Sequence, residues 1–163
     1  MASSLETFFV YPTPLGRITL ASDGKALTHM AFGVQQFSGT YTATALTNRA
    51  STEIQEYLAG KRTAFDIPLN PYGTQYQQKV WRALCSIPYG ETRSYKEVAQ
   101  MTGKPNAMRA VGMANNKNPL PVFIPCHRVI GAKGDLVGYA YGLKIKQFLL
   151  DLEKKATENG HLR

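Results

Sequence analysis

The segment Asn70-Pro-Tyr-Gly-Thr74 divides this chain into two stretches with different patterns of apolar residues. Short runs of strand character and one helical stretch precede it, whereas helical spacing dominates after it. A length of 163 residues suffices for two small domains, each with a core of its own. We therefore predict an α+β protein, with a sheet-and-helix domain over 1–73, a mainly helical domain over 74–155 and a frayed tail over 156–163.

The first stretch contains a β-hairpin pattern. Residues 17–22 and 26–32 have strand character, and Asp23-Gly24 between them tolerates the positive φ of a tight turn. Residues 49–59 have helical spacing, and residues 64–69 have the character of a further strand. These elements predict a small sheet with one helix.

The second stretch opens with a helix. Its apolar residues Tyr76, Val80, Leu84 and Ile87 recur at helical spacing and are expected to face the core. Cys85 lies in the same helix, and we interpret it as a buried apolar side chain in preference to a reactive thiol.

A helix-turn-helix pattern starts at residue 94. Ser94 and Glu97 form a capping box for a short helix that stops at Gly103, and a second helix begins near Asn106. Such a pair is typical of DNA-binding units, although helices that pack only on each other have the same pattern. The second helix carries small residues that allow close approach to a DNA groove or, equally, to a neighbouring helix: Ala107, Ala110, Gly112 and Ala114.

The positive charge of the chain is concentrated in its second half. The formal net charge is +8; residues 1–78 hold five basic and five acidic residues, and residues 79–155 hold thirteen and five. Basic side chains that displace counterions from phosphates supply affinity for nucleic acid that does not depend on sequence. The second domain is thus a candidate for binding DNA or RNA, although a basic surface also simply keeps a protein soluble.

Two cysteines and three histidines limit the metal and disulfide chemistry of the chain. Cys85 and Cys126 lie far apart with no CxxC pair, which favours neither a disulfide framework nor a structural zinc site. The sequence lacks both a signal-peptide pattern at its start and a run of about 18 apolar residues. We expect a protein of a reducing, intracellular compartment, neither exported nor in a membrane.

Cys126 and His127 place a thiol beside an imidazole. A thiol with its ordinary pKa is only a few per cent thiolate near neutral pH, so a nucleophilic cysteine needs a base or a cation nearby. His127 and Arg128 are the candidates. Because neighbouring side chains of a strand point apart, contact between Cys126 and His127 requires a turn or a bridging water. A Cys-His pair alone is more often structural, so the longer string around it matters.

The string Ile124-Pro-Cys-His-Arg-Val-Ile130 resembles the active-site signature of the O6-alkylguanine-DNA alkyltransferases. The resemblance continues in order and spacing through Ser94-Tyr95, residues 108–112, Asn118-Pro119, Gly138-Tyr139 and residues 149–153. It covers residues 74–155 closely, and the first 73 residues match in general character. The family implies a ribonuclease H-like first domain and a winged-helix-like second domain.

The resemblance implies the role of each residue that carries chemistry. Cys126 would attack the alkyl carbon on O6 of guanine, mainly a methyl group, with O4-alkylthymine as a second possible substrate. His127 would draw off the thiol proton through a water, with Glu153 orienting it, and Tyr95 would donate a hydrogen bond to the departing base. Because a thioether has no easy leaving group, the transfer would be a stoichiometric and irreversible suicide reaction.

The same resemblance implies how DNA is bound. Arg109 would enter the duplex in place of a damaged nucleotide that is rotated out. The second helix would lie in the minor groove, where little sequence is read. The expected DNA-binding residues are Arg109, Ala107, Ala110, Gly112, Asn115 and Arg128.

Three residues would shape the substrate pocket. Tyr139 would lie over the base, and Asn118 would brace the turn before the active-site segment. Tyr141 stands where the family commonly has glycine, so its phenol should narrow the pocket. We predict that methyl groups are accepted better than benzyl groups, with poor reaction toward free benzylated guanine.

The implied partner is double-stranded DNA that contains O6-alkylguanine, bound by a monomer, with cooperative binding along DNA as an alternative. No cofactor is expected: some members hold zinc through cysteines of the first domain, and residues 1–73 contain none. Cys126 should therefore work without metal. The protein would act where the DNA is, in the cytoplasm of a bacterium or the nucleus of a eukaryote.

Three other functions fit parts of the pattern. A non-catalytic repair adaptor that binds alkyl lesions would keep the fold and the arginine but replace the cysteine, whereas Cys126 is present. A transcription regulator that senses alkylation would need an effector domain, for which the chain has no room. A cysteine hydrolase would need an oxyanion hole or substrate pocket, and none is recognisable in the sequence.

Overall fold

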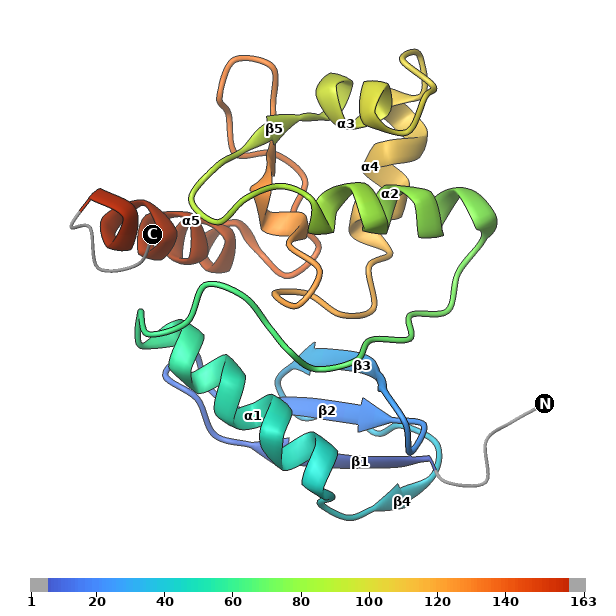
Figure 1. Ribbon diagram of the computed structural model, residues 1–163, viewed down its shortest axis with the longest axis vertical. Helices are drawn as coiled ribbons and strands as arrows, with labels where there is room; N and C mark the ends of the chain where they lie inside the picture. The colour runs from blue at the N-terminus through green and yellow to red at the C-terminus, as the bar shows by residue number, and fades with distance from the viewer. Residues whose placement is uncertain (1–5, 159–163) are drawn as a thin grey trace. The chain divides into compact units, whose positions relative to one another are not determined.

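The computed structural model describes residues 6–158, which fall into two compact units divided between residues 72 and 73 (Figure 1). The division lies one residue before the predicted one, inside the connector that follows the first sheet-and-helix stretch. None of the helices within residues 6–158 is both long and apolar enough to cross a membrane.

The first unit is a four-stranded sheet with one helix. Its elements are β1 (Thr7–Tyr11), β2 (Ile18–Ser22), β3 (Leu27–Phe32), β4 (Thr40–Tyr41) and α1 (Ala45–Leu58). The sheet has the order β3-β2-β1-β4, in which β4 pairs with β1 in parallel and the other neighbours are antiparallel. α1 packs across β1 and β2 (Figure 1) and buries Ile54 and Tyr57.

The hairpin of β2 and β3 confirms the predicted one. Gly24 has a φ of +94°, and the Asp23 carboxylate accepts hydrogen bonds of 2.9 Å from the backbone N–H groups of Lys25 and Ala26. Asp-Gly therefore supplies the turn geometry that its sequence indicates. The prediction did not contain β1, which pairs with β2 along its whole length.

Two predictions for this unit are corrected. α1 begins at Ala45 instead of residue 49, because Thr44 and Thr47 form a reciprocal capping box. Residues 64–69 do not form a strand. Leu69 makes one isolated bridge to Leu27, and Pro68 beside it has no N–H with which to extend a ladder.

The second unit is mainly helical. Its elements are α2 (Gln75–Cys85), β5 (Arg93–Ser94), α3 (Tyr95–Met101), α4 (Met108–Asn116), the 3₁₀ turn η1 (Cys126–Arg128), β6 (Val129–Ile130) and α5 (Leu143–Glu158). α2, α3 and α4 pack on one another, and Trp81 at their centre donates a 2.9 Å hydrogen bond to the Ala114 carbonyl. β5 and β6 form a short parallel pair.

The predicted helix-turn-helix is formed by α3 and α4. Ser94 caps α3, and its side chain and that of Glu97 bond each other's backbone N–H groups, which confirms the predicted capping box. Gly103 ends this part of the chain with a φ of +82°. α4 begins at Met108, two residues after the expected start.

Three further predictions for the second unit differ from the structure. Cys85 is exposed and not buried, because it lies on the outer face of α2. Tyr76 is half-buried, and its hydroxyl lies 2.9 Å from Oγ1 of Thr102. α5 continues past the expected boundary at residue 155 to Glu158, with Ala156 buried; the rest of the expected tail, 159–163, lies outside the described residues.

Candidate active site

The segment that carries Cys126 is a 3₁₀ turn and not an extended strand. η1 places Cys126, His127 and Arg128 at buried positions, with exposures of 1%, 0% and 7%. Successive side chains of a 3₁₀ turn diverge by about 120°, and so less than the opposed side chains of a strand. The thiol and the imidazole therefore share one buried region of the second unit.

The backbone before η1 is held by Asn118. Its side-chain nitrogen donates to the Ile124 carbonyl at 2.8 Å, and its side-chain oxygen accepts from the Leu120 N–H at 2.9 Å. Val122, inside this turn, has a φ of +73°, which strains a β-branched residue. Asn118 thus braces the turn between α4 and the nucleophile segment.

His127, Glu153 and Arg128 form a buried polar network. The His127 Nε2 lies 2.7 Å from Glu153 Oε2. Arg128 binds both oxygens of the same carboxylate, from Nε at 2.9 Å and from Nη2 at 2.9 Å. The Gly90 N–H donates to Glu153 at 3.0 Å. One carboxylate of α5 therefore fixes the two side chains that follow Cys126.

Arg128 is buried and bonded within the unit, which contradicts its predicted role as a DNA contact. Its third donor, Nη1, binds the Ile87 carbonyl at 2.7 Å, and its side chain is 8% exposed. A guanidinium ion buried to this extent needs acceptors for its N–H groups, and Glu153 and the Ile87 carbonyl accept three of them.

The network determines the protonation of its members. Burial would raise the pKa of Glu153, but the hydrogen bonds from His127 and Arg128 and the positive charge of Arg128 outweigh it and lower the pKa to about 2. Burial lowers the pKa of His127, against the opposing effect of Glu153. A neutral His127 that donates its Nε2 proton to Glu153 carries its lone pair on Nδ1, the atom that a base would use.

The thiol of Cys126 is protonated in the free protein. Burial raises its pKa, while hydrogen bonds to Asn118 and Tyr139 and the charge of Lys146 act in the opposite direction. A buried thiol with a raised pKa is a poor nucleophile unless a neighbouring group removes its proton. His127 is the neutral base of this region.

Three tyrosines lie near Cys126. The Tyr95 hydroxyl of α3 donates to the Val137 carbonyl at 3.2 Å, and burial raises the pKa of this phenol, which keeps it a donor. Tyr139 and Tyr141 pack edge to face, with centroids 5.4 Å apart. The Tyr141 hydroxyl donates to the Asn118 carbonyl at 2.7 Å, and burial raises its pKa to about 12.

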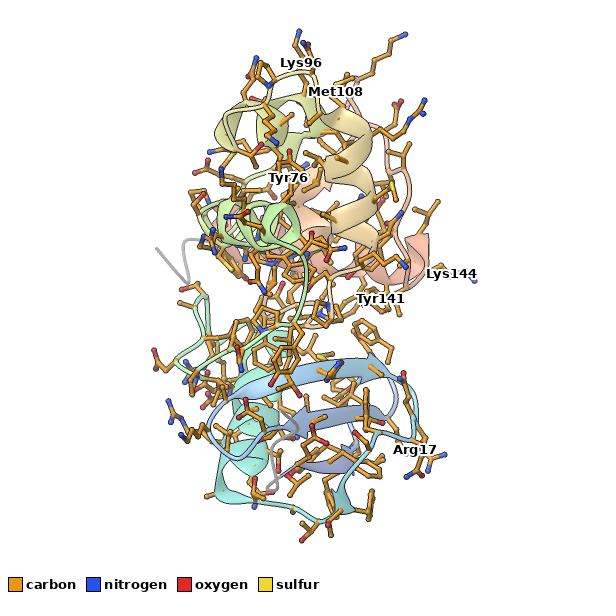
Figure 2. All side chains as sticks on the ribbon, turned by 90° about the vertical axis from the view of Figure 1, so that its right-hand side faces the viewer. Arg17, Tyr76, Lys96, Met108, Tyr141 and Lys144 are labelled. Atoms are coloured by element: carbon orange, nitrogen blue, oxygen red, sulfur yellow. The ribbon has the colours of Figure 1, made fainter. Side chains whose placement is uncertain are left out.

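The exposed face of α4 carries Arg109 together with two exposed methionines, Met108 and Met113. Arg109 is exposed, and Ala107, Ala110 and Gly112 are partly accessible. A Cβ added to Gly112 would meet Tyr95 at 3.9 Å, an ordinary contact, so packing within the unit does not require glycine there. Figure 2 shows Met108 and Lys96 at the outer end of the helix-turn-helix, and both are exposed.

The prediction that Asn115 contacts DNA is also corrected, as for Arg128. It is 2% exposed, and its side-chain nitrogen donates to the Cys126 carbonyl at 3.3 Å. Asn115 therefore holds the backbone carbonyl of the nucleophile, whereas the sequence predicted that it contacts DNA.

Sequence reasoning missed Lys146. Its side chain is fully buried, and its Nζ donates to the carbonyls of Val129 at 2.6 Å and Val137 at 3.0 Å. A signal was present, because the spacing of Lys146 from Leu149 and Glu153 is helical and places all three on the buried face of α5.

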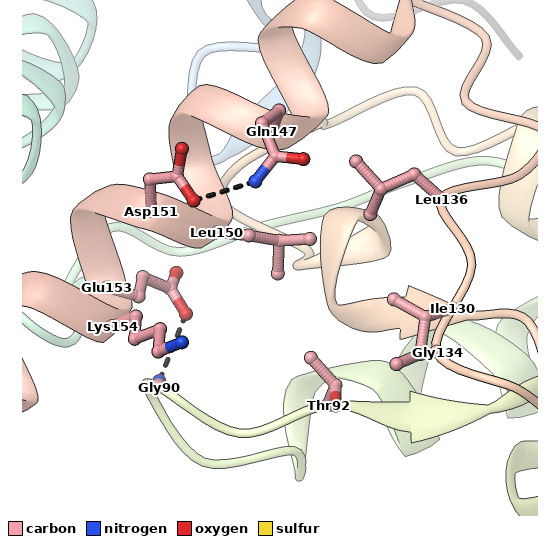
Figure 3. Close-up of a pocket in the computed structure, with 10 residues that line it drawn as sticks. All are labelled: Gly90, Thr92, Ile130, Gly134, Leu136, Gln147, Leu150, Asp151, Glu153 and Lys154. Atoms are coloured by element: carbon pink, nitrogen blue, oxygen red, sulfur yellow. Dashed lines mark hydrogen bonds between the residues drawn. The ribbon is translucent and has the colours of Figure 1, made fainter.

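A cavity of about 420 Å³ lies beside this site, between α5 and the β5–β6 pair (Figure 3). Thr92, Ile130, Leu150 and Asp151 line it together with Glu153. The predicted pocket residues Tyr139, Tyr141 and Asn118 do not line it. Within residues 6–158, no group of three His, Cys, Asp or Glu side chains has an arrangement that could hold a metal ion.

Two family models match the chain, one in each unit. Residues 8–71 match "6-O-methylguanine DNA methyltransferase, ribonuclease-like domain", and residues 75–155 match "6-O-methylguanine DNA methyltransferase, DNA binding domain". The two matches together span both units of the fold.

Curated proteins and solved structures agree with these matches. A methylated-DNA–protein-cysteine methyltransferase of Methanosarcina barkeri is 49% identical over 150 residues, which is 89% of this chain and 95% of the relative. One of Mycobacterium leprae is 47% identical over 87% of this chain and 88% of its own. A crystal structure of Mycobacterium tuberculosis OGT in complex with DNA superimposes with a TM-score of 0.86 at 44% identity, covering 92% of this chain and 94% of that one.

Proposed function

This chain belongs to the 6-O-methylguanine DNA methyltransferase family, and we propose that it repairs O6-alkylguanine in double-stranded DNA by transferring the alkyl group to Cys126. The observation that carries the proposal is the buried arrangement of Cys126 next to the hydrogen-bonded pair of His127 and Glu153. A thiol, a neutral base and a carboxylate that orients the base form the set of groups that a cysteine nucleophile needs.

The transfer exchanges one bond for another. The Cys126 sulfur attacks the alkyl carbon, a sulfur–carbon bond forms, and the bond between that carbon and O6 of guanine breaks. The thiol proton passes to Nδ1 of His127 through a water, while Glu153 stabilises the imidazolium. Guanine leaves with the electron pair and takes up one proton from water, while the His127 imidazolium returns its proton to water, so the base is restored with no net change in protons. No second half-reaction follows, because the thioether has no easy leaving group.

Tyr95 assists the departure of guanine. Its phenol is a donor with a raised pKa, now bonded to the Val137 carbonyl at 3.2 Å. We infer that the base replaces this carbonyl as the acceptor when it occupies the site. A hydrogen bond to the developing negative charge stabilises the transition state more than the ground state.

The exposed face of α4 meets the DNA. Arg109 is the long, charged side chain on this face, and the small residues Ala107, Ala110 and Gly112 let the helix backbone approach a minor groove. Arg109 enters the stack when the damaged nucleotide rotates out, which costs a few kcal/mol of unstacking. The protein acts as a monomer on the cell's DNA.

Tyr139 and Tyr141 limit the size of the alkyl group. Tyr141 is tied to Asn118 and packs on Tyr139, so its ring cannot swing away without losing both contacts. Methyl groups are therefore accepted better than benzyl groups.

The test is repair of a duplex that holds one O6-methylguanine, at protein amounts below and above the amount of DNA. We expect one lesion repaired per protein molecule, none by Cys126→Ala, and full repair by Cys85→Ala, which removes the exposed cysteine of α2. Tight binding of the lesion duplex without any repair would contradict the proposal and favour a repair adaptor.

A further inference from the structure

Lys146 is a buried positive charge that the mechanism above does not use. It is 0% exposed, and no carboxylate within residues 6–158 lies within ion-pair distance of it. A buried ammonium ion without an ionic partner is costly. The contacts around Lys146 must therefore account for a charged side chain on the buried face of α5.

The ammonium group joins the two backbone segments that flank the site. Val129, which accepts from Nζ at 2.6 Å, directly follows η1, and Val137, which accepts at 3.0 Å, begins the stretch that carries the pocket tyrosines. Val137 is also the acceptor of the Tyr95 hydroxyl. Lys146 thus holds the nucleophile segment and the Tyr95 acceptor, Val137, in one arrangement.

Lys146 is also the cation that acts on the sulfur. The charged and titratable groups around Cys126 are His127 and Arg128 of η1, Tyr95 of α3, Tyr139 and Tyr141 before α5, Lys146 and Glu153 of α5, and Cys85 of α2 beside Arg128. The charge of Arg128 is balanced by Glu153, which it binds twice. The attraction between Lys146 and Cys126 raises the pKa of the lysine and lowers that of the thiol, each against the larger effect of burial.

We propose that Lys146 is a positioning residue of the alkyl transfer, whose fixed ammonium ion stabilises the Cys126 sulfur as it becomes a thiolate. The inference rests on the proposed function. Lys146 keeps its protons throughout: the thiol proton goes to His127 through water, and no bond to Lys146 forms or breaks. Its contribution is a charge held in place by two carbonyls, so it needs no reorganisation during the reaction.

The test compares Lys146→Gln, Lys146→Met and Lys146→Arg with the wild type. The ionisation of Cys126 is followed in the free protein through its ¹³Cβ resonance, and the rate of a single methyl transfer from a saturating O6-methylguanine duplex is measured beside it. Gln retains hydrogen-bond donors without charge, Met retains neither, and Arg retains both. Lys144→Met is the matched control, because Lys144 is an exposed lysine of the same helix and its loss changes the net charge equally.

Loss of the charge should raise the pH at which the Cys126 thiolate forms. For Lys146→Gln and Lys146→Met we expect the midpoint of the Cys126 titration to be higher by about one pH unit, with a slower methyl transfer beside it. Lys146→Arg and Lys144→Met should keep the wild-type midpoint. A reduced transfer rate with an unchanged Cys126 midpoint in the Gln and Met variants would reveal a purely structural lysine and overturn the inference.

A second measurement needs no folded variant. The Nζ resonance of Lys146 in ¹⁵N-lysine wild-type protein should titrate at lower pH after methyl transfer than before, because a neutral thioether no longer favours the ammonium ion. An unchanged titration would overturn the inference even if every variant failed to fold. Failure of the wild type to transfer methyl at all would instead contradict the proposed function.

Discussion

Two arginines of the second unit show how differently its buried site and its exposed helix face use the same side chain. Arg128 is 7% exposed and donates hydrogen bonds to Glu153 and the Ile87 carbonyl. Arg109 lies on the exposed face of α4. In this basic domain the buried, paired arginine positions the residues of the site, whereas the exposed arginine is available to contact phosphates and bases.

Removal of Arg128 from the buried site should have the largest effect on the free energy of unfolding. Arg128→Met leaves Glu153 without its cation and the Ile87 carbonyl without its donor, so the free energy of unfolding should fall by about 3–5 kcal/mol. Urea denaturation measures it. Arg93→Met is the control, because Arg93 pairs with Glu91 at the surface at 3.0 Å and should cost less than about 1 kcal/mol. Equal losses in the two variants would contradict the account.

Acid should weaken the same network. The pKa of Glu153 in the folded protein is about 2, below its ordinary value of 4.5, so its contribution is present above pH 4.5 and is lost as the pH falls toward 2. His127 has a lowered pKa and stays neutral when folded, so stability already declines as the pH falls below 6.5, where unfolded histidine takes up a proton.

Together these groups should cost on the order of 3 kcal/mol between pH 7 and pH 2, measured by urea unfolding at a series of pH values. Glu153→Gln removes the carboxylate, so its curve should be flatter below pH 4.5. A slope identical to that of the wild type would show that other groups govern the acid response.

Removal of Arg109 should spare the fold and impair the reaction on duplex DNA. Arg109→Ala should change the unfolding free energy by less than about 0.5 kcal/mol. Transfer from a duplex should slow on the order of 100-fold, because unstacking of the damaged base is no longer compensated. Transfer from a single-stranded oligonucleotide, which is unstacked at lower cost, should fall much less; an equal loss on both substrates would contradict a role in rotating the base out.

Methylation itself should loosen the buried site. Cys126 is 1% exposed, and an extra carbon in a packed core costs about 1–3 kcal/mol. For a chain of this size, each kcal/mol lowers the melting temperature by about 2–4 °C. Differential scanning calorimetry before and after reaction measures the shift, with Cys126→Ala in the same mixture as control. An unchanged or raised melting temperature would count against this packing argument.

Widening the pocket should have the smallest effect. Tyr141→Ala should raise the rate with an O6-benzylguanine duplex about tenfold, equivalent to about 1.4 kcal/mol, with a smaller change for methyl. Tyr141→Phe keeps the ring and loses the bond to Asn118, so its discrimination should remain close to that of the wild type. If Tyr141→Ala discriminates as the wild type does, Tyr141 does not set the size limit.

The sequence predicted the parts of the fold that local chemistry determines. The Asp23-Gly24 turn and the Ser94–Glu97 capping box each depend on a few neighbouring residues, and both form as expected. Residues 64–69 have strand character, yet a strand needs a partner along its length, and Leu69 finds one only at Leu27. Such pairing is a tertiary property that propensity does not determine.

For the site, the motif identified the groups and the fold decided their environment. Cys126, His127 and Glu153 lie in one buried region, as their order in the motif led us to expect. The buried positions of Arg128 and Asn115 could not be predicted from residue type. Arginine and asparagine are usually exposed, and burial is expected only once a partner such as the Glu153 carboxylate or the Cys126 carbonyl is known. Lys146 was missed for the same reason, although its helical spacing indicated the buried face of α5.

The most direct test of the central claim, that Cys126 is the acceptor, is the intact mass of the protein after incubation with a duplex containing one O6-methylguanine, followed by peptide mapping. We expect the mass to increase by one methyl group. The increase should saturate at one per chain, lie on Cys126 and be absent from Cys126→Ala. A methyl group on the exposed Cys85, or no gain in mass while the lesion duplex is bound, would contradict it.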